Sequence, residues 1–259
     1  MGDFWRWSNI RFVKNDKVSI SRDFNPPICC SGDADTTQRD SSRIHIQKVD
    51  EMSRFHIIEH PLIAHKMSVL RDKETRTPLF RQTLREVAYL MTFAVTQHLD
   101  MVAVRIETPL EVADCHQLKA PNPCLVSILR AGNGLTEALL NILPEASVGH
   151  LGMARNDETL QPEKYYTKLP NDISVRQVIL ADPMLATAGS TVAAIDILRD
   201  HGVKDIVFMC LLAAPEGVER LRKAHPDVPI FTAALDRQLN EKGYILPGLG
   251  DAGDRIYGT

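Results

Sequence analysis

The sequence predicts an α/β fold: a doubly wound, mostly parallel sheet flanked by helices. Beyond residue 100, short apolar runs alternate with segments whose apolar residues recur at helical spacing. Several of these runs, such as 205–214 ("DIVFMCLLAA"), are apolar throughout, which is typical of parallel strands buried on both faces. A chain of 259 residues with 44% hydrophobic content is long enough to build the core that such a sheet requires.

The predicted elements are defined by apolar spacing and by proline or glycine at their ends. The predicted strands are 101–110, 124–129, 147–154, 175–181, 205–214 and 228–235. The predicted helices lie within 60–99 and at 134–143, 190–202 and 215–225. Thr77-Pro78 marks a helix start inside the first of these regions, and Gly202 is the glycine expected just past a helix end.

Residues 1–54 differ in texture from the rest of the chain. The segment 31–42 ("SGDADTTQRDSS") is polar, small and without periodicity, which predicts a linker or a disordered segment. The aromatic and basic run 4–12 ("FWRWSNIRF") is either a docking peptide or part of a poorly ordered tail with hydrophobic anchors. We therefore expect a partly disordered N-terminal extension, 1–54, followed by one domain, 55–259.

Composition argues against several classes of protein. The formal net charge of −3 offers no basic field for nucleic acid or an anionic membrane surface. No apolar run approaches the roughly 18 residues of a membrane span, and the N-terminus lacks the apolar stretch of a secretory signal. The cysteines are odd in number and lack metal-site spacing, which predicts reduced thiols and a cytoplasmic protein. They are Cys29, Cys30, Cys115, Cys124 and Cys210.

One predicted strand end has an unusual composition. The strand that ends at Ala181 is followed by Asp182, a proline and a run of small or hydroxylated residues up to Thr191. In a parallel sheet, ligands bind at the carboxyl ends of the strands, and the N-terminus of the next helix attracts anions. The run therefore predicts a cradle for a sugar phosphate, with Asp182 on the sugar hydroxyls. The alternative is a tight turn with an N-cap.

Two further strand ends carry an arginine. Arg130 follows the strand 124–129 within "SILRAGNGL", and Arg155 follows the strand 147–154 within "GMARNDETLQP". Guanidinium groups are charge-assisted and often bidentate partners of phosphate. Either arginine alone could be a solvated surface charge, but arginines at two strand ends beside the cradle favour a diphosphate site.

Five motifs together resemble the uracil phosphoribosyltransferase family. They are "LRAG", "RNDET", "DPMLATAGS", "AAPEG" and "GYILPGLGDAGDRIYGT", in this order, and the resemblance runs from about His60 to Thr259. The short Ala-Thr-Gly-Gly-Ser type of loop is shared by phosphoribosyltransferases generally. The C-terminal stretch is far more specific to the uracil enzymes.

The resemblance implies transfer of the 5-phosphoribosyl group from phosphoribosyl diphosphate (PRPP) to uracil, giving uridine monophosphate and diphosphate. The implied catalytic residues are Arg130 and Asp251. The implied PRPP-binding residues are Arg130, Arg155, Asp182, Pro183, Met184, Leu185, Ala186, Thr187, Ala188, Gly189, Ser190 and Asp251. Those implied for uracil are Ile245, Gly250, Asp251 and Ala252.

The family also implies a fold, a cofactor and partners. The fold is that of the phosphoribosyltransferases, with the C-terminal segment and a β-arm as a small hood over the base site. The cofactor is Mg²⁺, carried by PRPP and not by a set of protein ligands. The family implies a homodimer or homotetramer, and some relatives respond to GTP, which makes GTP a candidate effector. The segment 65–75 resembles the family's helical region near subunit contacts, and we assign no GTP site to it.

The C-terminal stretch suits a planar base. Its glycines, with Pro247, permit an irregular backbone that presents N–H and C=O groups in one plane, as uracil requires. Cytosine would leave a buried main-chain donor unpaired, at a cost of roughly 1–3 kcal/mol. The aliphatic and aromatic residues among the glycines argue against a tail with no ligand.

Charge development suggests the roles of these residues. As the bond from ribose C1 to diphosphate breaks, negative charge grows on the leaving group, where Arg130, Arg155 and Mg²⁺ would stabilise it. Asp251 would orient uracil or accept its N1 proton, and the sequence leaves both roles open. The polar stretch 155–170 would be a mobile cover that excludes water.

The sequence departs from the family pattern at a few positions. Ala188 stands where glycine is commoner, which is tolerable only with a negative φ angle. Asn133 replaces an aliphatic residue, and Ala154 replaces a larger one. Two alternatives remain: a catalytically weak or inactive protein that senses PRPP or a nucleotide on the same fold, and a transferase for another base.

Overall fold

The computed structural model describes residues 54–155 and 162–259. Residues 1–53, which belong to the predicted N-terminal extension 1–54, and residues 156–161, which belong to the predicted cover 155–170, lie outside it. Among the described residues, eight strands form one sheet in the order β1-β10-β9-β7-β4-β5-β6, with β8 beside β9. All neighbours are parallel except β5 and β6. The strands are β1 Phe55–Ile57, β4 Cys124–Leu129, β5 Ser147–Arg155, β6 Pro162–Lys168, β7 Gln177–Ala181, β8 Met184–Leu185, β9 Asp205–Ala213 and β10 Ile230–Leu235. This is the predicted mostly parallel sheet.

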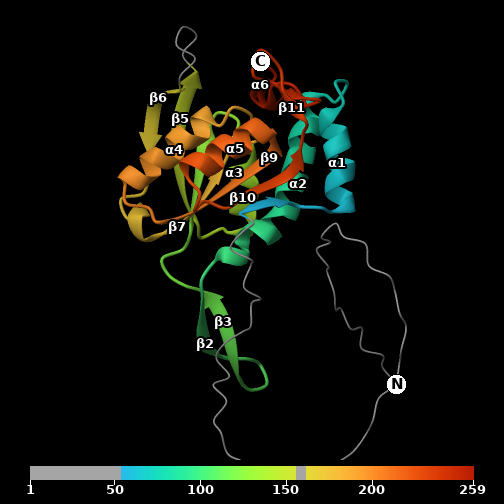
Figure 1. The fold of residues 1–259 in the computed structure, drawn as a ribbon. Helices are drawn as coiled ribbons and strands as arrows, with labels where there is room; N and C mark the ends of the chain where they lie inside the picture. Colours follow the sequence, from blue (N-terminus) through green and yellow to red (C-terminus); the bar gives the residue numbers. More distant parts are fainter. Residues whose placement is uncertain (1–53, 156–161) are drawn as a thin grey trace, which may run out of the picture. The chain divides into compact units, whose positions relative to one another are not determined.

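Helices cover the sheet, as Figure 1 shows. The α-helices are α1 Pro61–Arg71, α2 Thr77–Val95, α3 Asn133–Ile142, α4 Gly189–Asp200, α5 Pro215–Ala224 and α6 Ala252–Tyr257. The short 3-10 helices are η1 Thr96–His98 and η2 Ile173–Val175. The helix α2 begins at Thr77, and Gly202 follows α4 with a φ of 81°, as the sequence predicts.

The apolar strands are buried on both faces because successive side chains point to opposite sides of the sheet. In β9, Val207, Met209 and Leu211 pack with residues of α1, α2 and α3. The alternate residues Ile206 and Phe208 pack with residues of α4 and α5. Two clusters of core residues therefore cover the two faces, which confirms the doubly wound α/β fold.

A two-stranded arm was predicted in part. The strand expected at 101–110 ends at Glu107 as β2 (Met101–Glu107) and pairs antiparallel with β3 (Val112–Leu118). At the base of the arm, Asp100 N–H donates to Oε1 of Gln177, the first residue of β7. This contact lies at the amino end of the parallel strands. The prediction that a β-arm forms part of a hood over the base site is therefore wrong for this arm, because ligands bind at the opposite edge.

The strand β6 was not predicted. Residues 155–170 were expected to form a mobile cover, but Pro162–Lys168 pair antiparallel with β5 as an edge strand. The remaining residues, 156–161, lie outside the described part of the chain, so the cover stays a prediction there. Among the described helices, none combines the length and apolar character needed to cross a membrane.

Candidate active site

The three strand ends singled out by the sequence belong to adjacent strands. The strand β4 lies between β7 and β5, so Asp182 and Arg130 follow neighbouring strands. A Cβ atom on Gly132 would lie 2.4 Å from the Ala181 carbonyl oxygen, and glycine therefore allows the loop after β4 to pack against the end of β7. Arg155 ends β5, the other neighbour of β4, but its side chain lies outside the described residues.

The predicted phosphate loop is held from two sides. Its first part is tied to β9: the Pro183 carbonyl accepts from Leu211 and Leu212 N–H at 3.0 Å each, and Met184 and Leu185 form β8. Its second part is tied to α5, where a Cβ on Gly217 would lie 2.3 Å from the Ala186 carbonyl oxygen.

Further contacts fix the end of this loop and leave its helix free for an anion. Arg220 of α5 donates to the Thr187 carbonyl at 3.2 Å. The helix α4 starts at Gly189, followed by Ser190, and carries no acidic residue in its first turn. Its N-terminal dipole is therefore available to an anion.

The conformation of Ala188 overturns one expectation. The residue caps α4 with φ 60° and ψ 5°, in the left-handed region, whereas the sequence argument required a negative φ. The chain turns here from the loop into the helix, and alanine takes the conformation that glycine adopts without steric cost. Ala188 is also buried, so its methyl group lies against the core and not in solvent.

Asp182 is the titratable residue of this loop, and the pKa of its carboxyl is shifted from the usual value. Burial raises the pKa of its carboxyl to about 7; Met184 N–H lowers it, and the charge of Asp251 raises it further. The Met184 contact is long, at 3.5 Å, and part of the side chain still reaches solvent. The charge of Asp251 is close enough to disfavour ionisation of Asp182, so a cation or hydroxyl donors would stabilise the Asp182 carboxylate.

The C-terminal segment forms a small hairpin and a capped helix at this site. The strands β11 (Gln238–Leu239) and β12 (Ile245–Leu246) pair antiparallel. Gly250 has a φ of 82°, and Asp251 caps α6 by accepting a hydrogen bond from Asp254 N–H at 2.9 Å. Ile245 and Ala252 are buried, whereas Asp251 is exposed.

Arg130 contacts this C-terminal helix. Its guanidinium lies 3.7 Å from Asp254 Oδ1 and 5.7 Å from the centre of the Tyr257 ring. The Tyr257 hydroxyl donates to the Arg130 carbonyl at 2.9 Å. A Cβ on Gly253 would lie 3.2 Å from Asp251 Oδ1 and 4.0 Å from Arg130 Nη2. The structure thus brings the two residues predicted as catalytic, Arg130 and Asp251, to the same place.

Sequence reasoning missed Asp254 and Tyr257, and it left Asn133 unexplained. The buried Ser127 hydroxyl donates to Asn133 Oδ1 at 2.8 Å, which satisfies the polar side chain that stands in place of an aliphatic one. Asn133 also hydrogen-bonds the Tyr257 side chain. The "DRIY" run after the glycines was the available signal, because Asp254 and Tyr257 are three residues apart and would lie on one face of a helix.

The family is decided by comparison with known proteins. A family model described as uracil phosphoribosyltransferase matches residues 57–259. The chain belongs to the uracil phosphoribosyltransferase family. The uracil phosphoribosyltransferase of Mesorhizobium japonicum is 54% identical over 203 residues, which is 78% of this chain and 97% of the relative. That of Streptococcus mutans is 53% identical over 208 residues, covering 80% of this chain and 100% of the relative.

Solved structures agree on the phosphoribosyltransferase fold. The AQ2163 protein from Aquifex aeolicus matches with a TM-score of 0.74 and 35% identity, over 78% of this chain and 97% of that one. An adenine phosphoribosyltransferase from Trypanosoma brucei, at 12% identity, matches with a TM-score of 0.50 over 77% of this chain and 89% of that one. The second likeness supports the fold alone.

Proposed function

We propose that the residues gathered at the carboxyl edge of the sheet carry out the uracil phosphoribosyltransferase reaction. In this reaction the 5-phosphoribosyl group moves from PRPP to uracil, and uridine monophosphate and diphosphate are formed. The observation that carries the assignment of the site is the convergence of Arg130, Asp182 and Asp251 from three separate segments. Family membership supplies the reaction, and the geometry supplies candidates for each part of it.

The loop 182–190 would hold the ribose 5-phosphate. It leads into the N-terminus of α4, whose first turn lacks acidic residues, and the small side chains at 186–190 would leave room for a phosphate. The half-buried Asp182 carboxyl would accept hydrogen bonds from the ribose hydroxyls. The contacts of the loop with β9 and α5 keep it in place before PRPP arrives.

Arg130 would stabilise the leaving diphosphate. Its carbonyl accepts a hydrogen bond from Tyr257, and its guanidinium lies over the same ring, which orients the side chain toward the C-terminal helix. The Asp254 carboxylate is 3.7 Å away, so the guanidinium can still bind another anion. As the bond to ribose C1 breaks, negative charge develops where this guanidinium can reach it. Arg155 would act in the same way from the end of β5.

Uracil would lie against Ile245 and the run 250–252. Ile245 and Ala252 are buried and provide apolar walls, while the irregular backbone around Gly250 offers N–H and C=O groups to the base. Asp251 would orient uracil or accept its N1 proton. Its carboxylate already accepts from Asp254 N–H through Oδ1, which leaves Oδ2 for the base or the ribose.

The donor set fits Mg²⁺ brought in with PRPP. The negative charge of Asp251 disfavours ionisation of Asp182, and Mg²⁺ carried by the phosphates of PRPP would offset this repulsion. When bound, the ion would neutralise charge on the diphosphate. We extend the proposal to a homodimer or homotetramer, to GTP as an effector and to a cytoplasmic location, all of which rest on the family resemblance.

Release of diphosphate from PRPP tests this function. With Mg²⁺ present, uracil should trigger release and formation of uridine monophosphate, whereas cytosine, hypoxanthine and the absence of a base should not. If PRPP binds but no base triggers release, the protein acts as a sensor of PRPP and the catalytic proposal fails. If another base is preferred, the assignment of the base site fails while that of the phosphate site stands.

A further inference from the structure

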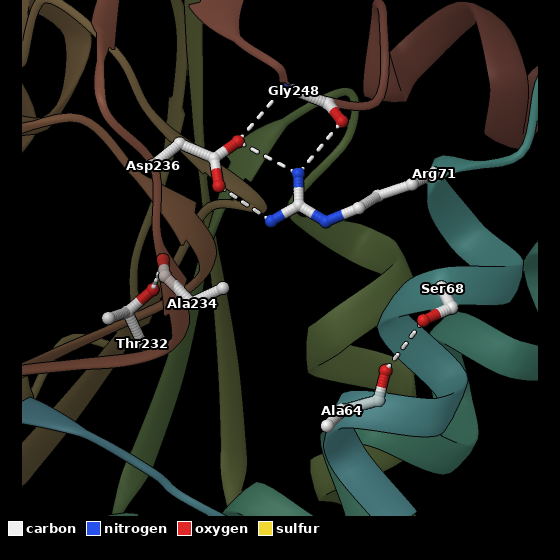
Figure 2. A network of polar contacts seen from close by, with 7 residues as sticks. All are labelled: Ala64, Ser68, Arg71, Thr232, Ala234, Asp236 and Gly248. Atoms are coloured by element: carbon white, nitrogen blue, oxygen red, sulfur yellow. Dashed lines mark hydrogen bonds and ion pairs between the residues drawn. The ribbon is translucent and has the colours of Figure 1, made fainter.

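A largely buried ion pair, outside the proposed substrate contacts, holds the segment that leads into the proposed uracil site. Arg71, the last residue of α1, binds Asp236 through its two terminal guanidinium nitrogens, Nη2 and Nη1, at 2.6 and 2.8 Å. Figure 2 shows the guanidinium pointing between Asp236 and Gly248. It also donates to the Gly248 carbonyl at 2.9 Å, and Gly248 N–H donates to Asp236 Oδ2 at 2.8 Å. Both main-chain groups of Gly248 are therefore held.

This pair is anchored firmly. The Asp236 side chain is 5% exposed and that of Arg71 is 26% exposed. Asp236 follows β10, and its N–H donates to the Ala213 carbonyl at 2.9 Å, which fixes it to the end of β9. A bidentate Arg–carboxylate contact with two extra main-chain bonds is geometrically specific. Gly248 is thus held relative to the central sheet and not only to its own hairpin.

A second arginine holds the next peptide group. Arg255 of α6 donates to the Leu249 carbonyl at 2.9 Å. The same guanidinium donates to the carbonyls of Leu70 and Asp72, at the end of α1, and lies 4.4 Å from the centre of the Phe80 ring. The last carbonyls of a helix lack partners within the helix, so the end of α1 offers a natural anchor.

Two consecutive carbonyls, those of Gly248 and Leu249, are therefore fixed by arginine side chains. In a trans peptide the C=O and the N–H of the next residue point in opposite directions within one plane. Fixing these two carbonyls sets the directions of Leu249 N–H and Gly250 N–H. Gly250 opens the run that the proposed function assigns to uracil, and its φ of 82° depends on that backbone course.

We propose that Arg71 and Arg255 are positioning residues for uracil recognition, with Asp236 holding Arg71 in place. The proposal rests on the assignment of 250–252 to uracil. Neither arginine contacts the phosphate loop, so the two should govern base affinity and selectivity and leave PRPP binding alone. An arginine network that merely stabilised the fold would instead weaken the binding of both substrates together.

The test compares Arg71→Gln and Arg71→Lys with Lys66→Gln as the matched control. Lys66 lies on the same helix and makes an ion pair of 2.5 Å with Glu86, away from the C-terminal segment. For each variant, kcat and KM are measured for uracil at saturating PRPP and for PRPP at saturating uracil, with the uracil-to-cytosine ratio of kcat/KM. Arg255→Lys is measured in the same way, because it keeps the charge but cannot hold four carbonyls at once.

We expect Arg71→Gln to raise the KM for uracil about tenfold or more, as the loss of a buried hydrogen-bonded partner implies. The KM for PRPP should change less than about twofold, uracil selectivity should fall, and Arg71→Lys should recover part of the loss. Equal changes in both KM values, or an unchanged KM for uracil, would overturn the proposal. If Arg71→Gln does not fold, Arg71→Lys and Arg255→Lys decide by the same split. An unmodified protein without uracil-dependent release would count against the proposed function and not against this inference.

Discussion

The loop proposed to bind phosphate and the segment proposed to bind uracil hold irregular backbone in two different ways. The loop 182–190 is fixed mainly by main-chain contacts to adjacent elements: β8 pairs with β9, and Gly217 lets α5 approach closely. The segment 236–253 is fixed by long side chains that reach across the fold. Arg71 and Asp236 lie 165 residues apart in the sequence, and Arg255 and Leu70 lie 185 apart.

The difference teaches where each region can vary. Main-chain contacts tolerate changes of side chain, and the loop carries an alanine at 188 although the φ there is 60°. The uracil segment depends on a few guanidinium groups that no other side chain imitates, because each serves several acceptors in a fixed geometry. In the uracil segment, single substitutions should therefore have strong effects where they remove a side chain that holds the backbone. Around the phosphate loop, they should have strong effects where they remove a charge.

The largest effect is expected where the phosphate side supplies charge. Replacing Arg130 by alanine should lower kcat about 10²–10³-fold, because one donor to the developing negative charge is lost. Arg130→Lys should retain part of the activity. Steady-state assays of diphosphate release measure both, with Arg222→Ala, an exposed position on α5, as the control. A loss of less than about tenfold for Arg130→Ala would show that this guanidinium does not face the leaving group.

Substitution of a residue that supports the proposed uracil segment should lower the stability of the protein. Asp236→Asn removes the charge that Arg71 pairs with, and should lower the free energy of unfolding by about 2–4 kcal/mol, since Arg71 remains partly accessible to water. Urea unfolding gives this value. The control is Asp172→Asn, which breaks an i,i+4 pair with Arg176 whose carboxylate is 51% exposed, and it should cost less than about 1 kcal/mol. Similar losses in the two variants would contradict a special role for the buried pair.

The same contrast explains what the sequence could predict. The phosphate cradle was recognisable because its signal is local: a strand end, an acid and small residues before a helix. The burial of β9 on both faces followed from its unbroken apolar run. Arg130 was found by its place after a strand, and in the structure it lies beside the C-terminal helix.

The supports of the uracil segment gave no such signal. Arg71 looks like an ordinary basic residue in the last turn of a helix, where it would favour the helix dipole. Asp236 follows a strand without any motif, and Tyr257 resembles a residue of an amphipathic helix. Their importance comes from contacts between distant parts of the chain, which periodicity cannot reveal. Short or edge strands such as β1, β6 and β11 were missed for a related reason, because they lack a continuous apolar run.

The dependence of stability on pH should be a smaller effect, and it should distinguish the two regions. The folded state holds the proton of Asp182 up to a pKa of about 7, whereas an unfolded aspartate releases it near pH 4. The unfolded state therefore binds fewer protons between these values, and this contribution to stability is present below about pH 4 and lost as pH rises toward 7. Because part of the side chain reaches solvent, we expect a loss of about 1–2 kcal/mol.

Thermal unfolding without PRPP or Mg²⁺ measures this dependence. Asp182→Asn should show a smaller fall between pH 4 and 7 than the unmodified protein. The Asp236→Asn variant should keep the dependence, because Asp236 lies in the other region. Parallel curves for the unmodified protein and Asp182→Asn would show that Asp182 titrates normally.

The smallest effect tests how far the phosphate loop tolerates its side chains. Ala188→Gly removes the Cβ at φ 60° and should raise the free energy of unfolding by about 1 kcal/mol. The same change at Ala193, inside α4, should lower it by a similar amount, because glycine in a helix interior costs about 1 kcal/mol relative to alanine. Opposite signs in urea unfolding would establish that the backbone conformation, and not residue size, decides the effect. If the left-handed φ of Ala188 strains the loop, Ala188→Gly should also lower the KM for PRPP and leave the KM for uracil unchanged. The Arg71 variants should instead change the KM for uracil and leave that for PRPP nearly unchanged.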